Sequence, residues 1–393
     1  MHFEQNVTQS IVVSGTAARR GACPTLSEPM PTGDGLLARI RVAGKVMTAR
    51  QLAELAALAD RWGNGLVEVT ARGNMQVRGL KSEAVRPFAD AVGALLSIET
   101  GLVVDTSPIA GDDPEEKADS RSVAADIRAA AAKFTGKLGP KVSVVVDGNG
   151  QISLASLKAD IRLEARDSGS WAVTLGGGQA QVMDPGGAVA ATLAVLGALA
   201  AIGPQSRASD LFPDGGAPAG DTFPVVRTFN LQHGTSSGIG LPFGAMDGKH
   251  LTRLAQAASA GGVSIFRLAP GHGLLLDGAD TALIAEANRL GFVTDSADPR
   301  QRVSACIGNR GCASGHIAAR ELASSLAAHT GPGHLHVSGC AKGCAHPRRA
   351  HMTLVGSEGG IGLVIDGRAG DTPSQILDEA GVKAVLGAWQ DGR

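Results

Sequence analysis

Two kinds of apolar pattern follow one another twice along the chain. After the capping residue Thr48, residues 49–62 place apolar side chains at helical spacing, and residues 66–77 then have the character of two short strands separated by a turn. The same order returns after Asp247, with a predicted helix and two predicted strands over residues 248–276. The pattern therefore predicts two copies of one α+β unit.

The two copies align without a gap, residues 47–79 on residues 246–278, at an offset of 199. Matching pairs include Met47 with Met246, Leu52 with Leu251, Leu55 with Leu254, Gly63 with Gly262 and Gly79 with Gly278. A weaker repeat matches residues 121–148 to residues 314–341, each a predicted helix that leads through Gly-Pro into a strand. We therefore expect two halves, each an α+β unit followed by an α/β unit, joined by the Pro-, Gly- and Ala-rich segment 203–224.

Composition narrows the class of protein. The 393 residues are 44 % hydrophobic and 19 % charged, with a formal net charge of -1, so neither a disordered chain nor a nucleic-acid partner is expected. The alanine-rich residues 187–203 fall short of the ~20 strongly apolar residues of a membrane span, which predicts a buried helix and no membrane contact. Residues 1–6 lack the features of a secretory signal, so a cytoplasmic location is expected.

Four of the five cysteines lie close together near the end of the chain. Cys306 and Cys312 form C-x5-C, and 27 residues later Cys340 and Cys344 form C-x3-C. Four thiolates are the usual ligands of a [4Fe-4S] cluster, and the glycines around them would let the backbone approach and donate N–H groups to sulfur. Structural zinc and four ordinary buried thiols are the alternatives, although the x5 spacing fits a zinc knuckle poorly. The fifth cysteine, Cys23, is expected to be a small buried side chain.

This cysteine pattern resembles that of the siroheme-dependent sulfite and nitrite reductase superfamily. Residues 338–346 (SGCAKGCAH), 70–76 (TARGNMQ) and 105–111 (DTSPIAG) are similar to motifs of that superfamily. The resemblance covers about residues 20 to 365. It implies an α+β fold with a duplicated sulfite/nitrite reductase-like architecture: two ferredoxin-like half-domains plus two α/β cofactor-binding domains. The boundaries that follow are 20–100 for the first half-domain, 101–202 for an α/β domain without a cluster, 203–224 for the linker, 225–298 for the second half-domain and 299–393 for the iron-sulfur cluster domain.

Within the superfamily, the chain is most similar to the precorrin-3B synthases. The similar segments are residues 20–24, 30–37, 70–74 and 339–347. Sulfite and nitrite reductases have Gln after the pocket arginine and a K-x-K pair, whereas here Gly73 follows Arg72 and Lys141-Val-Ser143 keeps one lysine. The cationic cage that a small oxyanion needs is therefore incomplete. The resemblance implies an oxygen-dependent monooxygenase that converts precorrin-3A to precorrin-3B in aerobic cobalamin biosynthesis.

The same resemblance implies cofactors and partners. Precorrin-3A and dioxygen are the expected substrates, and the family is associated with a [4Fe-4S] cluster and a mononuclear non-haem iron whose ligands the sequence does not reveal. The chain has neither a G-x-G-x-x-G dinucleotide motif nor a P-loop, so a separate reductase or ferredoxin is expected to donate electrons. Siroheme is expected only if the chain is a reductase.

Five polar residues are candidate substrate ligands. They are Arg72, Asn74, Gln76, Arg78 and Lys141. Guanidinium, ammonium and amide groups could pair with the carboxylates of a precorrin, and the plain alternative for each is a solvated strand face or a satisfied turn. We expect Arg72 and Lys141 to point into a cavity that Cys344 borders. The sequence identifies no catalytic acid or base.

Two other functions remain open. One is a siroheme-dependent sulfite or nitrite reductase, in which Cys344 would bridge the cluster and the haem iron. The other is an iron-sulfur electron-transfer protein or a zinc-stabilised binding module, neither of which needs a duplicated Thr-x-Arg segment and a large cavity. Intense porphyrinoid absorption of the purified protein would favour the reductase.

Overall fold

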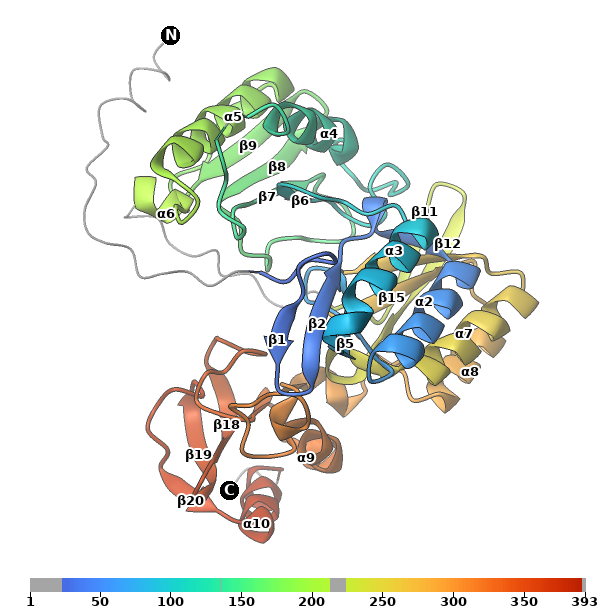
Figure 1. The fold of residues 1–393 in the computed structure, drawn as a ribbon, viewed down its shortest axis with the longest axis vertical. Coiled ribbons are helices and arrows are strands. Elements are labelled where there is room, and N and C mark those ends of the chain that lie inside the picture. The colour runs from blue at the N-terminus through green and yellow to red at the C-terminus, as the bar shows by residue number, and fades with distance from the viewer. Residues whose placement is uncertain (1–22, 135, 213–223, 391–393) are drawn as a thin grey trace.

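The structure, a computed structural model, describes residues 23–134, 136–212 and 224–390. Four five-stranded sheets form three units within these residues: a central unit of two sheets and two α/β units of one sheet each (Figure 1). Residues 20–22 of the predicted N-terminal motif and residues 213–223 of the predicted linker lie outside the described residues.

The central unit is built by both halves of the chain. The first half supplies β1 (Met30–Thr32), β2 (Gly35–Ile40), β3 (Val46–Thr48), α2 (Ala49–Trp62), β4 (Leu66–Val69), β5 (Met75–Leu80) and α3 (Val85–Leu95). The second half supplies β11 (Thr228–Leu231), β12 (Gly234–Gly240), β13 (Ala245–Asp247), α7 (Gly248–Ala260), β14 (Ile265–Ala269), β15 (Gly273–Asp277) and α8 (Thr281–Arg289). β3, α2, β4 and β5 correspond in order to β13, α7, β14 and β15, which confirms the predicted pair of α+β copies.

Each copy gives one strand to the sheet of the other. The sheet orders are β1-β2-β5-β4-β13 and β11-β12-β15-β14-β3. In these sheets Met246 lies opposite Val67, and Met47 lies opposite Phe266. Helices α2 and α7 lie side by side, and both copies contribute to one continuous core (Figure 1). The predicted half-domains therefore share a single core, which the sequence pattern does not reveal.

The first α/β unit follows the first copy. It contains β6 (Val103–Asp105), α4 (Ser120–Ala131), β7 (Ser143–Asp147), β8 (Ile161–Asp167), β9 (Ser170–Leu175), β10 (Gln181–Met183), α5 (Pro185–Ile202) and α6 (Ala208–Leu211). Strands β6, β7 and β8 are parallel, and β9 and β10 continue the sheet antiparallel.

Helix α5 corresponds to the predicted apolar helix. By length and composition it could cross a membrane, but Ala188, Val195 and Leu199 lie in the core of the first α/β unit. About a third of the helix is buried, so it is a core helix with one exposed face rather than a wholly buried one.

The second α/β unit carries the four clustered cysteines, and we call it the cysteine unit. It contains β16 (Val303–Ala305), α9 (Ala319–Leu326), β17 (Leu335–Ser338), β18 (Ala350–Ser357), β19 (Gly360–Gly367), β20 (Gln375–Leu377) and α10 (Glu379–Gln390). Its sheet also has three parallel strands followed by two antiparallel ones. The shared strand pattern and the match of β7 to β17 agree with the weaker predicted repeat.

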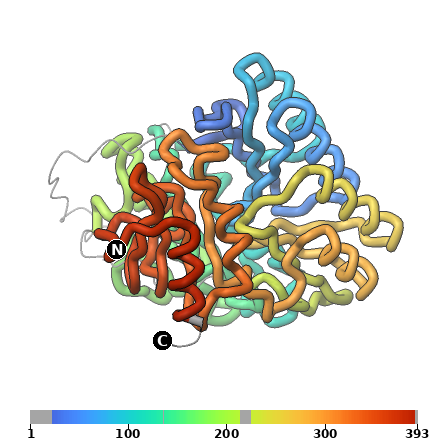
Figure 2. The backbone as a smooth tube through the Cα atoms, turned by 90° about the horizontal axis from the view of Figure 1, so that it is seen from below, coloured from blue at the N-terminus to red at the C-terminus, as the bar shows by residue number. Residues whose placement is uncertain are grey.

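The two α/β units lie at opposite ends of the long axis, with the central unit beside both (Figure 1). Figure 2, seen along that axis from below, places the cysteine unit in front of the first α/β unit. The start of the predicted linker belongs to the first α/β unit, because Arg207 pairs with Asp160 at 2.8 Å. The predicted domain boundaries themselves stay predictions.

The shared core makes a prediction about cooperativity. Leu52 of α2 is fully buried against residues of both copies, so Leu52→Ala is expected to lower the free energy of unfolding by about 2–5 kcal/mol. Because the core is continuous, amide hydrogen exchange should become faster in residues 228–277 as well as in residues 30–95. Val182→Ala, at a side chain that is 65 % exposed, is the control. Faster exchange confined to residues 30–95 would contradict a shared core.

Candidate functional site

The four cysteines lie in loops at one edge of the cysteine-unit sheet. Cys306 follows β16 and Cys340 follows β17, and these two strands are parallel neighbours with Ala305 opposite Val337. Parallel strands end at the same edge of a sheet, so the two cysteines leave it side by side. Burial and the nearby thiols of Cys340, Cys306 and Cys312 raise the pKa of the Cys344 thiol. All four thiols are thus close enough to interact electrostatically.

The loops around the thiols fit together only with glycine. A Cβ on Gly339 would lie 2.8 Å from Gly308 Cα and 3.3 Å from Cys306 Sγ, and a Cβ on Gly308 would lie 2.3 Å from the carbonyl oxygen of Ile317. The Gly339 N–H donates to Cys306 Sγ at 3.1 Å. Four thiols with a backbone N–H aimed at sulfur are a donor set that suits an iron-sulfur cluster. In this structure no three His, Cys, Asp or Glu side chains of the described ranges gather closely enough to hold a single metal ion.

The first copy of the central unit contacts this cysteine loop through the β1–β2 hairpin. The Gly33 N–H donates to the carbonyl oxygen of Gly311 at 3.1 Å, and Arg78 Nη2 donates to the same oxygen at 2.7 Å. Arg78 also forms a two-pronged ion pair with Asp34, at 3.0 and 3.1 Å, and both side chains are less than 10 % exposed. This pair fixes the hairpin against the residue that precedes Cys312.

A buried polar network extends from Arg78 to helix α9. Glu68 of β4 accepts from Arg320 of α9 at 2.6 Å and lies 3.8 Å from Arg78 Nη1. Gln76 donates to Glu68 at 2.9 Å and accepts from Arg39 at 3.1 and 3.0 Å, so both ends of its amide are engaged. The central unit is thus tied to the cysteine unit by charge as well as by packing.

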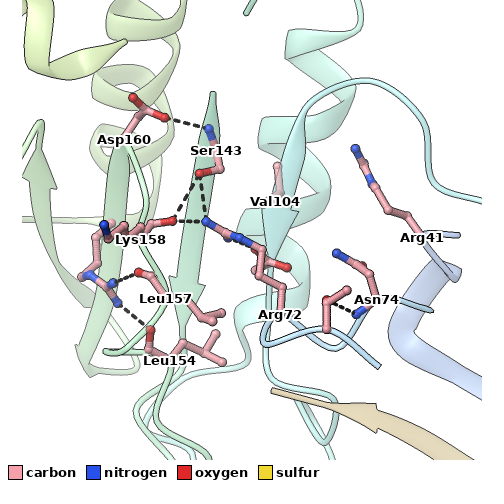
Figure 3. Close-up of polar contacts among 12 residues, drawn as sticks. Arg41, Arg72, Asn74, Val104, Ser143, Leu154, Leu157, Lys158 and Asp160 are labelled. Atoms are coloured by element: carbon pink, nitrogen blue, oxygen red, sulfur yellow. Dashed lines mark hydrogen bonds and ion pairs between the residues drawn. The ribbon is translucent and has the colours of Figure 1, made fainter. Parts of the chain in front are cut away.

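Arg72 lies against the first α/β unit, beside Ser143 and Lys158 (Figure 3). Its Nη1 is 2.5 Å from Asp105 Oδ2, and its other nitrogen donates to the carbonyl oxygen of Lys158. Lys45 Nζ donates to Asp105 Oδ1 at 3.1 Å and to the Arg72 carbonyl oxygen at 2.8 Å. Burial would raise the pKa of Asp105, but the charges of Lys45 and Arg72 outweigh it and hold that pKa below its ordinary value.

The structure therefore separates the five predicted substrate ligands. Arg78 and Gln76 are buried between the central unit and the cysteine unit, whereas Arg72 reaches the first α/β unit. The backbone N–H of Asn74 donates to Thr70 Oγ1 and closes the turn, and Lys141 is exposed just before β7. Their roles in substrate binding stay predictions, as does the cavity expected between Arg72, Lys141 and Cys344. A pocket of about 440 Å³ lies away from these residues, between α4 and α5 of the first α/β unit.

Three histidines that look scattered in the sequence meet beside the cysteine loop. The rings of His334 and His346 stack with centroids 4.4 Å apart, and Ser304 Oγ lies 2.9 Å from both His334 Nε2 and His336 Nδ1. Burial and the neighbouring histidines lower the pKa of His334 to about 3, so the ring is neutral at pH 7. The spacing of residues 334 and 336, which places alternate strand side chains on one face, is the sequence signal for this cluster.

The Arg78–Asp34 pair generates the first prediction of the site. Arg78→Met leaves the Asp34 carboxylate buried without its cation, so the free energy of unfolding should fall by about 3–5 kcal/mol. Adding Asp34→Asn removes that uncompensated charge and should restore part of the loss. Urea unfolding of both single variants and the double variant measures the coupling. Simple addition of the two single effects would show that the pair does not interact.

The Lys45–Asp105 pair generates a pH-dependent prediction. The ionised Asp105 stabilises the fold above its unfolded pKa of about 3.9, and this contribution is lost as the pH falls through the lower native pKa. Lys45→Met should raise the native pKa of Asp105, so its deficit in unfolding free energy should be larger at pH 7 than at about pH 3. Urea unfolding at both pH values measures this, with Arg50→Met at a side chain that is 85 % exposed as the control. An equal deficit at both pH values would contradict the assignment.

Comparison with known proteins places this geometry in a family. Residues 28–95, which span β1 to α3, match the nitrite/sulfite reductase ferredoxin-like half domain. The solved structure of the Mycobacterium tuberculosis NirA protein is similar with a TM-score of 0.66 and 18 % identity, over 87 % of this chain and 76 % of that one. This likeness confirms the duplicated reductase-like fold.

Two curated relatives are similar in sequence. A ferredoxin–nitrite reductase of Synechococcus elongatus is 33 % identical over 94 residues, which is 22 % of this chain and 18 % of that protein. A precorrin-3B synthase of Sinorhizobium is 38 % identical over 410 aligned residues, which cover 95 % of this chain and 89 % of that protein. With this identity over nearly the whole length of both proteins, the chain belongs to the precorrin-3B synthase family.

Proposed function

We propose that this protein is an oxygen-dependent monooxygenase that converts precorrin-3A to precorrin-3B in aerobic cobalamin biosynthesis. The observation that carries the proposal is the 38 % identity to a precorrin-3B synthase over 95 % of the chain. The site agrees with a redox reaction, because four thiols lie where the cysteine unit meets the central unit.

Cys306, Cys312, Cys340 and Cys344 are the proposed ligands of a [4Fe-4S] cluster, which would supply one-electron transfer to the reaction when bound. The Gly339 N–H would add a hydrogen bond to the Cys306 sulfur, which tunes the reduction potential of such centres. A separate reductase or ferredoxin is the proposed electron donor, and the cytoplasm is the proposed location. The proposal also includes a mononuclear non-haem iron, to which no ligands are assigned.

The substrate is proposed to bind between the central unit and its two neighbours. The Arg72 side chain is 28 % exposed although it pairs with Asp105, so a precorrin carboxylate could share its guanidinium. Asn74 and Lys141 are the other accessible candidates. Arg78 and Gln76 are proposed to act indirectly, because their polar groups already hold the cysteine loop and Glu68.

A specific observation weighs against sulfite or nitrite reduction. The second position of the lysine pair is Ser143, whose residue is 3 % exposed and whose Oγ lies 3.4 Å from the Lys158 carbonyl oxygen. The serine supplies no cation of its own, and Arg72, whose Nη2 lies 3.5 Å from Ser143 Oγ, is already paired with Asp105, so a cage for a small oxyanion would lack the charge of the second lysine.

The proposed function is tested by anaerobic purification followed by iron and sulfide analysis, an absorption spectrum and turnover of precorrin-3A under ¹⁸O₂. We expect iron and sulfide, no intense porphyrinoid bands, and product that carries one ¹⁸O atom. Porphyrinoid bands with sulfite or nitrite reduction would overturn the proposal in favour of a siroheme enzyme. Zinc without iron would favour a binding module.

The ligand set gives a sharper prediction. Cys306→Ser removes one proposed thiolate and should abolish the cluster absorbance and the turnover of precorrin-3A, because the loops at 306–312 and 340–344 are joined through the cluster. Cys23→Ser, at the cysteine outside the cluster, is the matched control and should keep both. Full absorbance in Cys306→Ser would show that the ligand set is wrong.

A further inference from the structure

His272 adopts a backbone conformation that normally favours glycine. It lies in the turn between β14 and β15 with φ +68°, and neither a glycine nor an asparagine stands there. At the equivalent turn of the first copy, offset by 199, Gly73 has φ +70°. A left-handed conformation is less favourable for a residue with a Cβ than for glycine, so the chain carries this imidazole at a cost to stability.

The space for the imidazole is made by a second glycine. A Cβ on Gly244 would lie 2.5 Å from His272 Nδ1. The residue equivalent to Gly244 in the first copy is Lys45, whose side chain binds Asp105. At these two equivalent positions the first copy has Lys45 and Gly73, and the second copy has Gly244 and His272. Gly244 therefore leaves room for the imidazole that Lys45 would not leave at the equivalent position of the first copy.

A hydrogen bond fixes the tautomer of His272. Its Nδ1 lies 2.7 Å from the carbonyl oxygen of Val69, which can only accept, so Nδ1 carries the proton. In the neutral ring Nε2 is then an unprotonated acceptor. Within the described part of the chain, Nε2 has no hydrogen-bond partner and is not among the fully enclosed polar atoms.

The turn that carries His272 lies beside the Arg72 turn of the first copy and beside the charged network that leads to the cysteine loop. The Gly271 N–H donates to the carbonyl oxygen of Ala71, next to Arg72. The charges of Glu68 and Arg320 act on the imidazole, and Glu68 leads through Arg78 to the cysteine loop. Burial lowers the pKa of His272, against the hydrogen bond to Val69 and the charge of Glu68.

We propose that His272 is the proton-transfer residue of the monooxygenation, with Nε2 taking a proton from water and passing it to oxygen. This inference rests on the proposed function. Dioxygen takes two electrons from the external reductase or ferredoxin and two protons. Its O–O bond breaks, one oxygen atom is added to the tetrapyrrole as a hydroxyl group, and the other leaves as water. Because Nδ1–H stays on Val69, Nε2 is the nitrogen that exchanges the proton.

The test uses the full-length, cluster-loaded protein with precorrin-3A and a reductase system. His272→Gly should slow precorrin-3B formation by about 10²-fold or more, with unchanged cluster absorbance and unchanged substrate affinity. Its thermal stability should change little, because the relief of φ +68° by glycine opposes the loss of the packed imidazole and of its hydrogen bond to Val69. Added imidazole should fill the vacated space beside Gly244 and restore part of the rate.

Two further variants make the result specific. His272→Asn tolerates the left-handed backbone and can still donate to Val69, but it carries no transferable proton, so it should be as slow as His272→Gly and not respond to imidazole. His233→Gly removes an exposed histidine from the β11–β12 turn and should keep the wild-type rate.

The outcomes separate the two proposals. A wild-type protein that does not convert precorrin-3A overturns the proposed function and with it the role of His272. An active wild type with an equally active His272→Gly overturns the role of His272 alone. A slow His272→Gly that has lost cluster absorbance or stability, or that imidazole does not rescue, would assign His272 a structural role instead.

Discussion

The reciprocal exchange of β3 and β13 is the constraint on which the rest of the structure depends. Each strand is three residues long and completes the sheet of the opposite copy, so neither sheet reaches five strands without both halves. The exchange brings α2 and α7 together over one core and sets the two equivalent turns, at residues 70–73 and 269–272, against each other. The turn at residues 70–73 in turn contacts the first α/β unit through Arg72.

The two copies share a backbone but bind their neighbours with opposite charge. At equivalent positions of β4 and β14 stand Glu68, which binds Arg320 of the cysteine unit, and Arg267, which binds Asp112 of the first α/β unit. Lys45 and Arg72 close the contact with the first α/β unit, whereas the equivalent positions of the second copy are Gly244 and Gly271, which carry no charged side chain. The duplicated turn therefore carries two cations in the first copy and neither of them in the second.

The sequence predicts the repeated units and the grouping of the cysteines. It does not predict the strand exchange or which arginine contacts the cysteine loop, for physical reasons. Helical and strand periodicity in residues 47–79 and 246–278 identifies the copies, because the apolar side chains at this spacing are buried in both. Strand exchange leaves no such trace, since three-residue strands carry little periodicity and pair across about 200 residues of sequence. The grouping of the cysteines is predictable from spacing. The sequence does not predict that Arg78, rather than Arg72, contacts the cysteine loop. This contact depends on how the separate units pack against one another.

The exchanged strands also constrain how the protein is made. During synthesis β3 emerges from the ribosome long before β14, its partner, and β4 is exposed until β13 follows it. The nascent first copy therefore presents an unpaired sheet edge and the uncovered apolar face of α2 for the time needed to translate about 200 residues. Such an edge is prone to pair with other chains. The first half is therefore open to such pairing until the second half has been translated.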